Sequence, residues 1–451
     1  MVGFRSGKQT AGVLNTKQLD SCWMPFTANR DFKQSPRLIN AAKGHYYTSA
    51  DGRQLYDAFS GLWTSGLGHC HPKIVEAVQQ QVATLDYGMA FQMGHDTIFQ
   101  LSEQLTALAP EGINHAFYTN SGSESADTAL KIALAYHRAK GDASRTVLVG
   151  RQRGYHGVNF GGISVGGMMP NRQAFHANLI PGVQHLLHTY NHEHQAFSHG
   201  QPSWGEHLAD SLEDICLLQG PNNIAAVIVE PVAGSTGILP PPTGYLQRLR
   251  EICDRYSILL IFDEVITAFY RVGDAFGADR FGVTPDIITT AKGLTNGVIP
   301  MGAVLVSDKI YNTFMEQPGQ GVEFFHGYTY SGHPVAAAAA LASLEIYKEE
   351  GIAEQAQALE PVLEAAIHSL DNHPKVRDIR NIGLMGAVEL ESREGALGAR
   401  GMEAHKTCFW EEDLVIRNGV DTLQFSPFLN SNPEDINKTF ETIKRVIDNL
   451  K

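Results

Sequence analysis

Short apolar runs alternate with longer amphipathic segments through the middle of the chain, from about residue 73 to residue 333. The apolar runs, which predict strands, lie at 116–119, 146–149, 225–229, 258–262, 285–291 and near 303. A helix is predicted at 124–140, closed by Gly141, and an amphipathic segment follows at 244–256. This alternation predicts an α/β fold with a mostly parallel sheet and helices on both faces.

The two ends of the chain show a different pattern. Residues 1–20 are polar and irregular, and residues 44–62 alternate as strands do around Asp51-Gly52, which predicts a hairpin turn. An alanine-rich helix is predicted at 336–350 and a charged helix at 433–450, with mixed helix and short strands between them.

These patterns suggest three segments. We expect residues 73–333 to form a large domain around the parallel sheet. Residues 334–451 should form a smaller α+β domain, and residues 1–72 should be an N-terminal segment that belongs to this smaller domain.

Composition narrows the possible partners. The formal net charge is −13, from 48 acidic and 35 basic residues, which argues against nucleic acid or an anionic membrane as a partner. No run of about 18 apolar residues is present, so no membrane span is expected. Residues 1–8 lack the apolar core of a signal peptide. The five cysteines are widely spaced and odd in number, which favours a reduced cytoplasmic setting over a disulfide framework.

Two side chains at predicted strand ends carry the strongest chemical signal. Lys292 follows the run 285–291, and Asp263 follows the run 258–262. In open α/β sheets ligands bind beyond the carboxyl ends of the strands, so the two side chains should meet at one mouth. Pyridoxal phosphate needs both groups, because its aldehyde forms an imine bond with a lysine and its ring nitrogen needs a carboxylate to stay protonated.

A phosphate site is predicted where the strand at 116–119 runs into the next helix. Asn120-Ser121-Gly122-Ser123-Glu124 places a glycine and hydroxyls at a helix start, where free N–H groups favour an anion. Tyr155, in Gly154-Tyr155-His156-Gly157, could stack on a flat ring. Each feature alone also fits an ordinary role as a helix cap, an ion pair, a surface lysine or a buried loop tyrosine. Their order at successive strand ends favours the cofactor.

Three other motifs lead to weaker hypotheses. Gly162-Ile163-Ser164-Val165-Gly166 matches the GxSxG of serine hydrolases, but glycines precede it and Gly167-Met168-Met169-Pro170 should break any helix after it. The histidine-rich stretches 69–71 and 185–199 could suggest a metal, yet no matching cysteine or carboxylate set completes a site. The sequence has no GxxxxGK[ST] loop, which disfavours a P-loop NTPase.

Four motifs together resemble the class III pyridoxal-phosphate aminotransferases: Ser121-Gly122-Ser123-Glu124, Gly154-Tyr155-His156-Gly157, Asp263-Glu264-Val265 and Thr290-Ala291-Lys292-Gly293. The resemblance covers nearly the whole chain. It implies the type I, aspartate-aminotransferase-like fold and an obligate homodimer with active sites at the subunit interface, with a dimer of dimers left open. The chain is most similar to the β-alanine:pyruvate (ω-amino acid:pyruvate) group, on the segments 60–63, 66–72, 230–237 and 421–427.

The resemblance also implies roles for individual residues. Lys292 would form the imine bond and Asp263 would pair with the ring nitrogen, and these are the expected catalytic residues. Arg417 would bind a substrate carboxylate, for which a planar guanidinium is suited, and Trp63 and Tyr155 would line the substrate pocket. The expected cofactor-binding residues are Ser121, Gly122, Ser123, Tyr155, His156, Glu230, Asp263, Val265, Lys292 and Thr329. Of these, Thr329 would reach the phosphate of the other subunit.

The implied reaction moves an amino group from a β-alanine-like ω-amino acid or a primary amine to pyruvate, giving a semialdehyde or ketone and alanine. Another donor (4-aminobutyrate, taurine, putrescine or an arylalkylamine) and 2-oxoglutarate as acceptor are the alternatives within the family. Outside it, a serine hydrolase built on Ser164 and a non-catalytic protein that keeps the fold are the alternatives.

Overall fold

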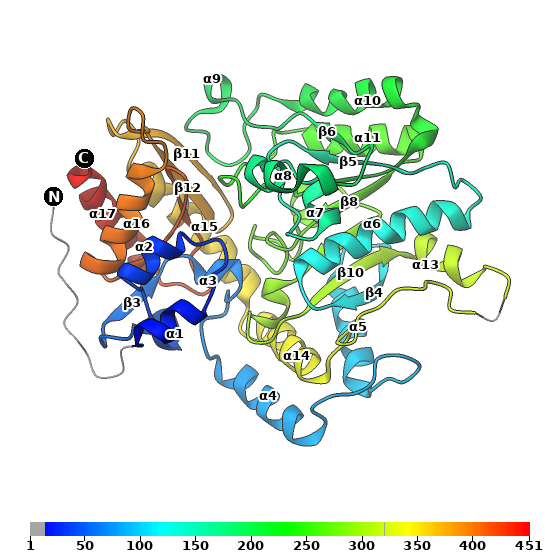
Figure 1. The fold of residues 1–451 in the computed structure, drawn as a ribbon, viewed down its shortest axis with the longest axis horizontal. Coiled ribbons are helices and arrows are strands. Elements are labelled where there is room, and N and C mark those ends of the chain that lie inside the picture. The colour runs from blue at the N-terminus through cyan, green and yellow to red at the C-terminus, as the bar shows by residue number, and fades with distance from the viewer. Residues whose placement is uncertain (1–13, 320) are drawn as a thin grey trace.

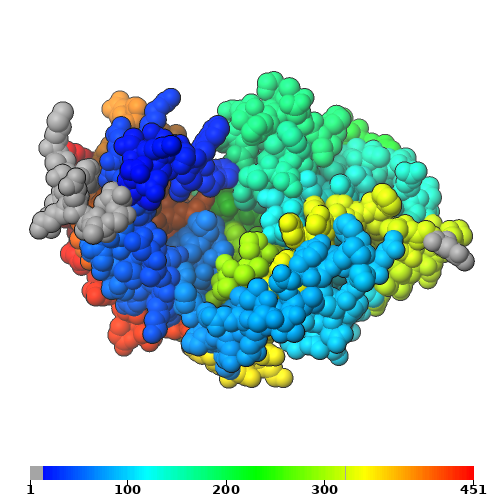
Figure 2. All heavy atoms as spheres, turned by 60° about the horizontal axis from the view of Figure 1, so that its bottom comes forward, coloured from blue at the N-terminus to red at the C-terminus, as the bar shows by residue number. Residues whose placement is uncertain are grey.

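The computed structural model describes residues 14–319 and 321–451. Figure 1 shows two lobes: the blue N-terminal and orange-to-red C-terminal segments share one, and the cyan and green middle of the chain forms the other. Figure 2, seen from another direction, again places the dark-blue residues beside the red and orange ones. The prediction of no signal peptide concerns residues 1–8, which lie outside the described residues.

A seven-stranded sheet forms the centre of the larger lobe, in the order β4-β10-β9-β8-β7-β5-β6. Its strands are β4 (Ile113–Thr119), β5 (Val147–Arg151), β6 (Gln184–Leu186), β7 (Ile224–Val229), β8 (Leu259–Asp263), β9 (Ile287–Thr290) and β10 (Gly302–Ser307). β10 is antiparallel to both of its neighbours, and the other pairs are parallel. The predicted mostly parallel sheet is confirmed.

The central strands are buried on both faces, which explains their unbroken apolar runs. Successive side chains of a strand point to opposite faces. Ile228 accordingly packs in one cluster with helix α6 (Gly122–Ala139), and Val227 packs in another with helix α11 (Tyr245–Tyr256). The prediction of helices on both faces is also confirmed.

Two four-stranded sheets lie in the smaller lobe. One has the order β1-β2-β3-β13, from β1 (Ile39–Lys43), β2 (Tyr46–Ser49), β3 (Gln54–Asp57) and β13 (Leu414–Val415). The other is antiparallel, in the order β11-β12-β15-β14, from β11 (Val376–Ile382), β12 (Met385–Leu390), β14 (Arg417–Gly419) and β15 (Thr422–Phe425).

The predicted hairpin at Asp51-Gly52 is confirmed, because β2 and β3 pair as antiparallel neighbours across it. β3 also pairs in parallel with β13, with Tyr56 opposite Leu414. The first and last parts of the chain therefore share one sheet.

The other helices cover these sheets. The α-helices are α1 (Thr16–Ser21), α2 (Asn29–Gln34), α3 (Ser60–Trp63), α4 (Pro72–Thr84), α5 (Asp96–Leu108), α7 (Phe160–Val165), α8 (Met169–Phe175), α9 (His192–Gln195), α10 (Ser211–Gln219), α12 (Gly277–Phe281), α13 (Asp308–Met315), α14 (Pro334–Glu349), α15 (Ile352–His368), α16 (Ala399–Glu411) and α17 (Pro433–Asn449). The described residues also contain four short 3₁₀ turns: η1 (His176–Asn178), η2 (Glu206–Asp210), η3 (Pro221–Asn223) and η4 (Lys292–Thr295). Among the described residues, no helix is both long and apolar enough to cross a bilayer.

One local expectation was wrong. The stretch expected to be irregular up to residue 20 contains α1, whose start is capped by the side chain of Asn15. The expected break after the GxSxG motif is present, since α7 ends at Val165, but it is short. Helix α8 begins at Met169, with Pro170 in its first turn, where the missing N–H costs nothing.

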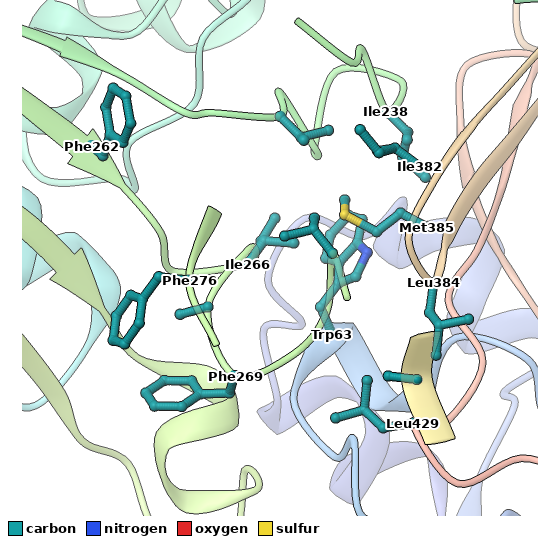
Figure 3. Packing of buried hydrophobic residues seen from close by; sticks show 14 of the residues in the cluster. Trp63, Ile238, Phe262, Ile266, Phe269, Phe276, Ile382, Leu384, Met385 and Leu429 are labelled. Carbon is teal, nitrogen blue, oxygen red and sulfur yellow. The ribbon is translucent and has the colours of Figure 1, made fainter. Parts of the chain in front are cut away.

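The two lobes share a continuous apolar core. Figure 3 shows Trp63 and Ile266 in the middle of this core, between Phe262, Phe269 and Phe276 on one side and Leu384, Met385 and Leu429 on the other. Trp63 is only 4% exposed, so its indole is fixed between the lobes beside the mouth of the large sheet.

Candidate active site

A cavity of about 820 Å³ lies at the carboxyl ends of the parallel strands. Eleven of the twelve residues predicted for the site line it: Trp63, Ser121, Gly122, Ser123, Tyr155, His156, Glu230, Asp263, Val265, Lys292 and Arg417. Thr329 does not line it. Thr329 lies in an exposed turn, where its carbonyl accepts a hydrogen bond from the Tyr87 hydroxyl at 3.0 Å.

Lys292 begins the 3₁₀ turn η4, separated from the end of β9 by Ala291 alone, and has a left-handed backbone (φ 44°). Its Nζ lies 4.9 Å from the centre of the Trp63 ring. Burial lowers the pKa of its amine from 10.5 to about 8, since the Asp263 carboxylate, which favours the ammonium, offsets the burial only in part. The turn after Lys292 is tied to the segment after Trp63, because Asn296 accepts from the Leu67 N–H and donates to the Gly68 carbonyl.

Asp263 ends β8 and is held on both of its oxygens. Oδ2 lies 2.7 Å from His156 Nδ1, and Oδ1 accepts from the Thr289 hydroxyl at 3.1 Å and from the Val265 N–H at 3.2 Å. A carboxylate only accepts, so His156 must carry its proton on Nδ1. His156 Nε2 is buried without a protein partner among the described residues. The carboxylate is thus fixed in direction at the floor of the cavity.

The start of α6 lines the same cavity and has the local geometry that suits an anion. Ser121 caps the helix by accepting from the Glu124 N–H, and Glu124 accepts from the Asn120 N–H at 2.7 Å. The first-turn N–H groups of Gly122 and Ser123 have no intrahelical partner, and together with the positive end of the helix dipole they favour the binding of an anion. A Cβ on Gly122 would come within 2.9 Å of both Val265 methyl carbons, so only glycine fits there.

Two further residues line the cavity: Glu230, which is buried, and Tyr155, which is half-buried. Glu230 is 4% exposed and accepts from the N–H groups of Tyr155 at 2.9 Å and Gly234 at 3.1 Å. Burial raises the pKa of Glu230, and nearby Asp263 raises it further, although His156 acts in the opposite direction. Burial likewise raises the pKa of Tyr155, so its phenol stays neutral and offers an aromatic face to the cavity.

Arg417 places a cation in the wall of the cavity. Its guanidinium lies 5.2 Å from the centre of the Trp63 ring and 6.0 Å from that of Phe59, and its Nη1 donates to Gln424 Oε1. No carboxylate of residues 14–319 or 321–451 pairs with it. Burial lowers its pKa, but an arginine remains charged near neutral pH. The cavity therefore holds a cation that is free to bind an anionic substrate group.

The serine hydrolase hypothesis is wrong. Ser164 lies inside helix α7 rather than in a strand–turn–helix elbow, and it is fully buried. Its hydroxyl donates to the Phe160 carbonyl at 2.5 Å and accepts from the Ile180 N–H at 2.8 Å, so it is not available as a nucleophile.

The histidine-rich stretch does meet a carboxylate, which the sequence reasoning missed. His199 lies beside His368 and Asp371 from the smaller lobe, with potential ligand atoms within 4.8 Å of one another. The two imidazole rings stack nearly in parallel, with centres 3.7 Å apart. Nitrogen lone pairs lie in the ring planes, so in this arrangement they do not converge on one ion.

Comparison with known proteins gives the same assignment as the geometry. The family model for aminotransferase class III matches residues 27–447. The chain belongs to the class III aminotransferases. It is 54% identical to an omega-aminotransferase of Caulobacter vibrioides, over 95% of this chain and 97% of the relative. It is 49% identical to a beta-alanine–pyruvate aminotransferase of Pseudomonas aeruginosa, over 97% and 98% of the two chains.

A solved structure supports the fold assignment of this class III aminotransferase. The omega transaminase of Pseudomonas jessenii in complex with PMP superposes with a TM-score of 0.90 at 32% identity, over 96% of this chain and 97% of that one. The predicted type I fold, the aminotransferase reaction and pyridoxal phosphate as cofactor are thereby confirmed. The hypothesis of a non-catalytic scaffold has no support, since the lysine, the carboxylate and the anion site face one cavity.

Sequence reasoning missed two supporting residues. Thr289 was treated only as part of a strand, and Gln424 only as part of a motif. Thr289 could have been inferred from register, because β8 and β9 place it opposite Asp263. Gln424 could not have been inferred in this way, because its pairing opposite Arg417 depends on a short antiparallel pair that leaves a weak pattern in the sequence.

Proposed function

We propose that this class III aminotransferase transfers the amino group of a β-alanine-like ω-amino acid to pyruvate. The observation that carries the proposal is the joint presence of Lys292, Asp263 and the unpaired Arg417 in one cavity. The two relatives named above, together with an omega-amino acid–pyruvate aminotransferase of Pseudomonas putida at 49% identity, support this substrate pair.

The cavity fits pyridoxal phosphate at each of its three polar groups. The N–H groups of Gly122 and Ser123 suit the phosphate, Asp263 suits the protonated ring nitrogen, and Lys292 suits the aldehyde. When bound, the cofactor supplies an electron sink for the carbon that loses a proton. Tyr155 and Val265 line the cavity as the aromatic and aliphatic surfaces expected against the two faces of the ring.

Three side chains of the protein have separate roles in the proposed reaction. The amine of Lys292, with its pKa near 8, is the base that moves a proton at the substrate carbon. Asp263, held by His156 and Thr289, would keep a negative charge available to the ring nitrogen of the bound cofactor. Arg417 binds the substrate carboxylate, so the amine end of an ω-amino acid is directed toward Lys292.

A panel of amine donors and keto-acid acceptors tests whether pyruvate is the preferred acceptor. With β-alanine as donor, alanine should be released from pyruvate, and 2-oxoglutarate should support little turnover. Release of glutamate at a comparable rate would overturn the pyruvate assignment. Putrescine and 4-aminobutyrate belong in the same panel, because the chain is 38% identical to a putrescine–pyruvate aminotransferase of Pseudomonas aeruginosa and 32% identical to a gamma aminobutyrate transaminase of Solanum lycopersicum.

We further propose that the enzyme is a homodimer in which Thr329 completes the partner's phosphate site. An exposed apolar patch surrounds this residue, formed by Tyr87, Met89, Phe91, Met93, Phe99, Val322, Phe325 and Tyr330. Its two segments lie side by side, with the Tyr87 and Tyr330 ring centres 6.0 Å apart. A patch of this kind marks a protein interface. Phe325, which is 94% exposed, gives the test: Phe325→Glu should yield monomers in light scattering and weaken cofactor retention, and a dimer unchanged by it would refute the placement.

We also propose a cellular compartment and a domain division for this enzyme. The enzyme works in the cytoplasm, residues 73–333 form the large cofactor-binding domain, and residues 1–72 and 334–451 together form the small domain. Two features support the domain division. β3 and β13 share a sheet, and the seven-stranded sheet is built entirely from residues 113–307.

A further inference from the structure

Gln424 is the residue that holds Arg417. The two side chains lie directly opposite each other on neighbouring strands β14 and β15, and Arg417 Nη1 donates to Gln424 Oε1. Gln424 is fully buried. Arg417 itself is half-buried, and its contact with a fully buried amide restricts the direction in which the guanidinium can point.

The orientation of the Gln424 amide is set from its other side. Nε2 donates to the Gly234 carbonyl at 3.4 Å, and a carbonyl can only accept. Oε1 is therefore turned toward Arg417. The same Gly234 donates its own N–H to Glu230, which also receives the Tyr155 N–H. A continuous series of hydrogen bonds thus connects Arg417, in the smaller lobe, to the cavity wall that carries Tyr155.

The chemical identity of the partner matters as much as its position. A neutral amide oxygen accepts one hydrogen bond and leaves the positive charge of Arg417 uncompensated. A carboxylate in the same place would form a buried ion pair and compete with any substrate carboxylate for the guanidinium. The rings of Trp63 and Phe59 lie beside the guanidinium and attract its charge without neutralising it.

We propose that Gln424 is a positioning and specificity-determining residue, which directs Arg417 into the cavity and keeps its charge available for a substrate carboxylate. This inference rests on the proposed role of Arg417 as the carboxylate-binding group. It predicts that changes at Gln424 affect substrates with a carboxylate and leave carboxylate-free amines nearly untouched.

The test uses two substitutions in the cofactor-loaded enzyme, with pyruvate as acceptor at saturating concentration. Gln424→Glu keeps the shape and adds the competing charge, and Gln424→Met removes the hydrogen bond at similar length. In Gln424→Glu, the KM for β-alanine should rise about 10- to 100-fold, the range for loss of a charge-assisted hydrogen bond. The rise in Gln424→Met should be smaller, about threefold to tenfold. The KM for 1-phenylethylamine, which has no carboxylate, should change less than about twofold.

A binding measurement separates this effect from turnover. The dissociation constant of propionate, a carboxylate without an amine, is measured by calorimetry and should rise in parallel with the KM for β-alanine. Gln104→Glu, on the exposed part of α5, adds the same charge elsewhere and should change neither value. If Gln424→Glu is poorly folded, Gln424→Met decides the question.

The Arg417→Gln substitution separates the carboxylate-binding role of Arg417 from the positioning role of Gln424. If this substitution leaves the propionate constant and the β-alanine KM unchanged, the proposed carboxylate-binding role is wrong, and the role of Gln424 falls with it. If Arg417→Gln raises both values but neither Gln424 variant does, only the positioning role is refuted. Equal losses with β-alanine and 1-phenylethylamine in the Gln424 variants would also refute it.

Discussion

The amine of Lys292 should capture the cofactor at a pH where an ordinary lysine is almost inert. Only the neutral amine attacks an aldehyde, and burial lowers the pKa of Lys292 from 10.5 to about 8. At pH 7 the neutral fraction is then about 9%, compared with about 0.03% for an unperturbed lysine, a difference of about 300-fold. The rate at which the apoenzyme attaches pyridoxal phosphate to Lys292 should therefore rise with pH and reach half of its maximum near pH 8.

Two substitutions should move this midpoint in opposite directions. Asp263 favours the ammonium form and Arg417 disfavours it. Asp263→Asn should lower the midpoint below pH 8, and Arg417→Gln should raise it. Attachment is followed by borohydride trapping at short times and mass spectrometry of the peptide that contains Lys292. Because this readout does not require turnover, it remains valid in variants that are inactive.

Either of two results would refute the explanation given for the lowered pKa of Lys292. A wild-type midpoint near pH 10 would show that the amine is solvated rather than buried. A shift of both variants in the same direction would show that the two charges do not act on Lys292 as their positions imply. Free Nα-acetyl-lysine, treated in the same way, supplies the unperturbed reference.

Three further predictions concern stability, packing and the excluded hydrolase. The pKa of Lys292 is lower in the fold than in the unfolded chain, so its ammonium destabilises the apoenzyme fully below about pH 8 and progressively less up to pH 10.5. Lys292→Met should therefore raise the free energy of unfolding in urea at pH 7 by up to about 3 kcal/mol, and an equal gain at pH 10.5 would contradict this sign. Gly122→Ala should weaken cofactor binding about tenfold, because the added Cβ would overlap both methyl groups of Val265. Gly321→Ala is the matched control, because a Cβ at that position has no atom within 4 Å. Equal cofactor affinity of the two variants in fluorescence titrations would refute the steric argument. Ser164→Ala should lower the free energy of unfolding by about 1–2 kcal/mol through two lost hydrogen bonds, with turnover unchanged, and loss of activity in a folded variant would reopen the hydrolase question.

The sequence alone predicted that Asp263 and Lys292 meet in one cavity, because the relevant signal is local. Asp263 and Lys292 each follow an apolar run directly, and the carboxyl ends of parallel strands meet at one edge of the sheet. The glycine and serines at the start of α6 are equally local, since a helix start is defined within a few residues. These side chains line one cavity in the structure.

Residues that act through pairing across long separations were not predictable in this way. Gln424 reaches its role through the register of β14 with β15 and through a carbonyl about 190 residues earlier. His199 meets His368 only because a loop of the larger lobe packs against α15. The helix at Met169–Phe175 was missed because Pro170 was interpreted as a helix breaker, although a proline in the first turn is well tolerated.

The parallel pairing of β3 with β13 constrains the order in which this protein can fold during synthesis. Tyr56 leaves the ribosome long before its strand partner Leu414. Residues 113–307, which supply all seven strands of the large sheet, are complete before then. In the nascent chain the β2–β3 hairpin therefore lacks its partner strand β13, and one edge of β3 stays unpaired while the central domain forms. A ribosome-bound chain truncated before residue 414 should show protease protection of the large sheet but not of the hairpin.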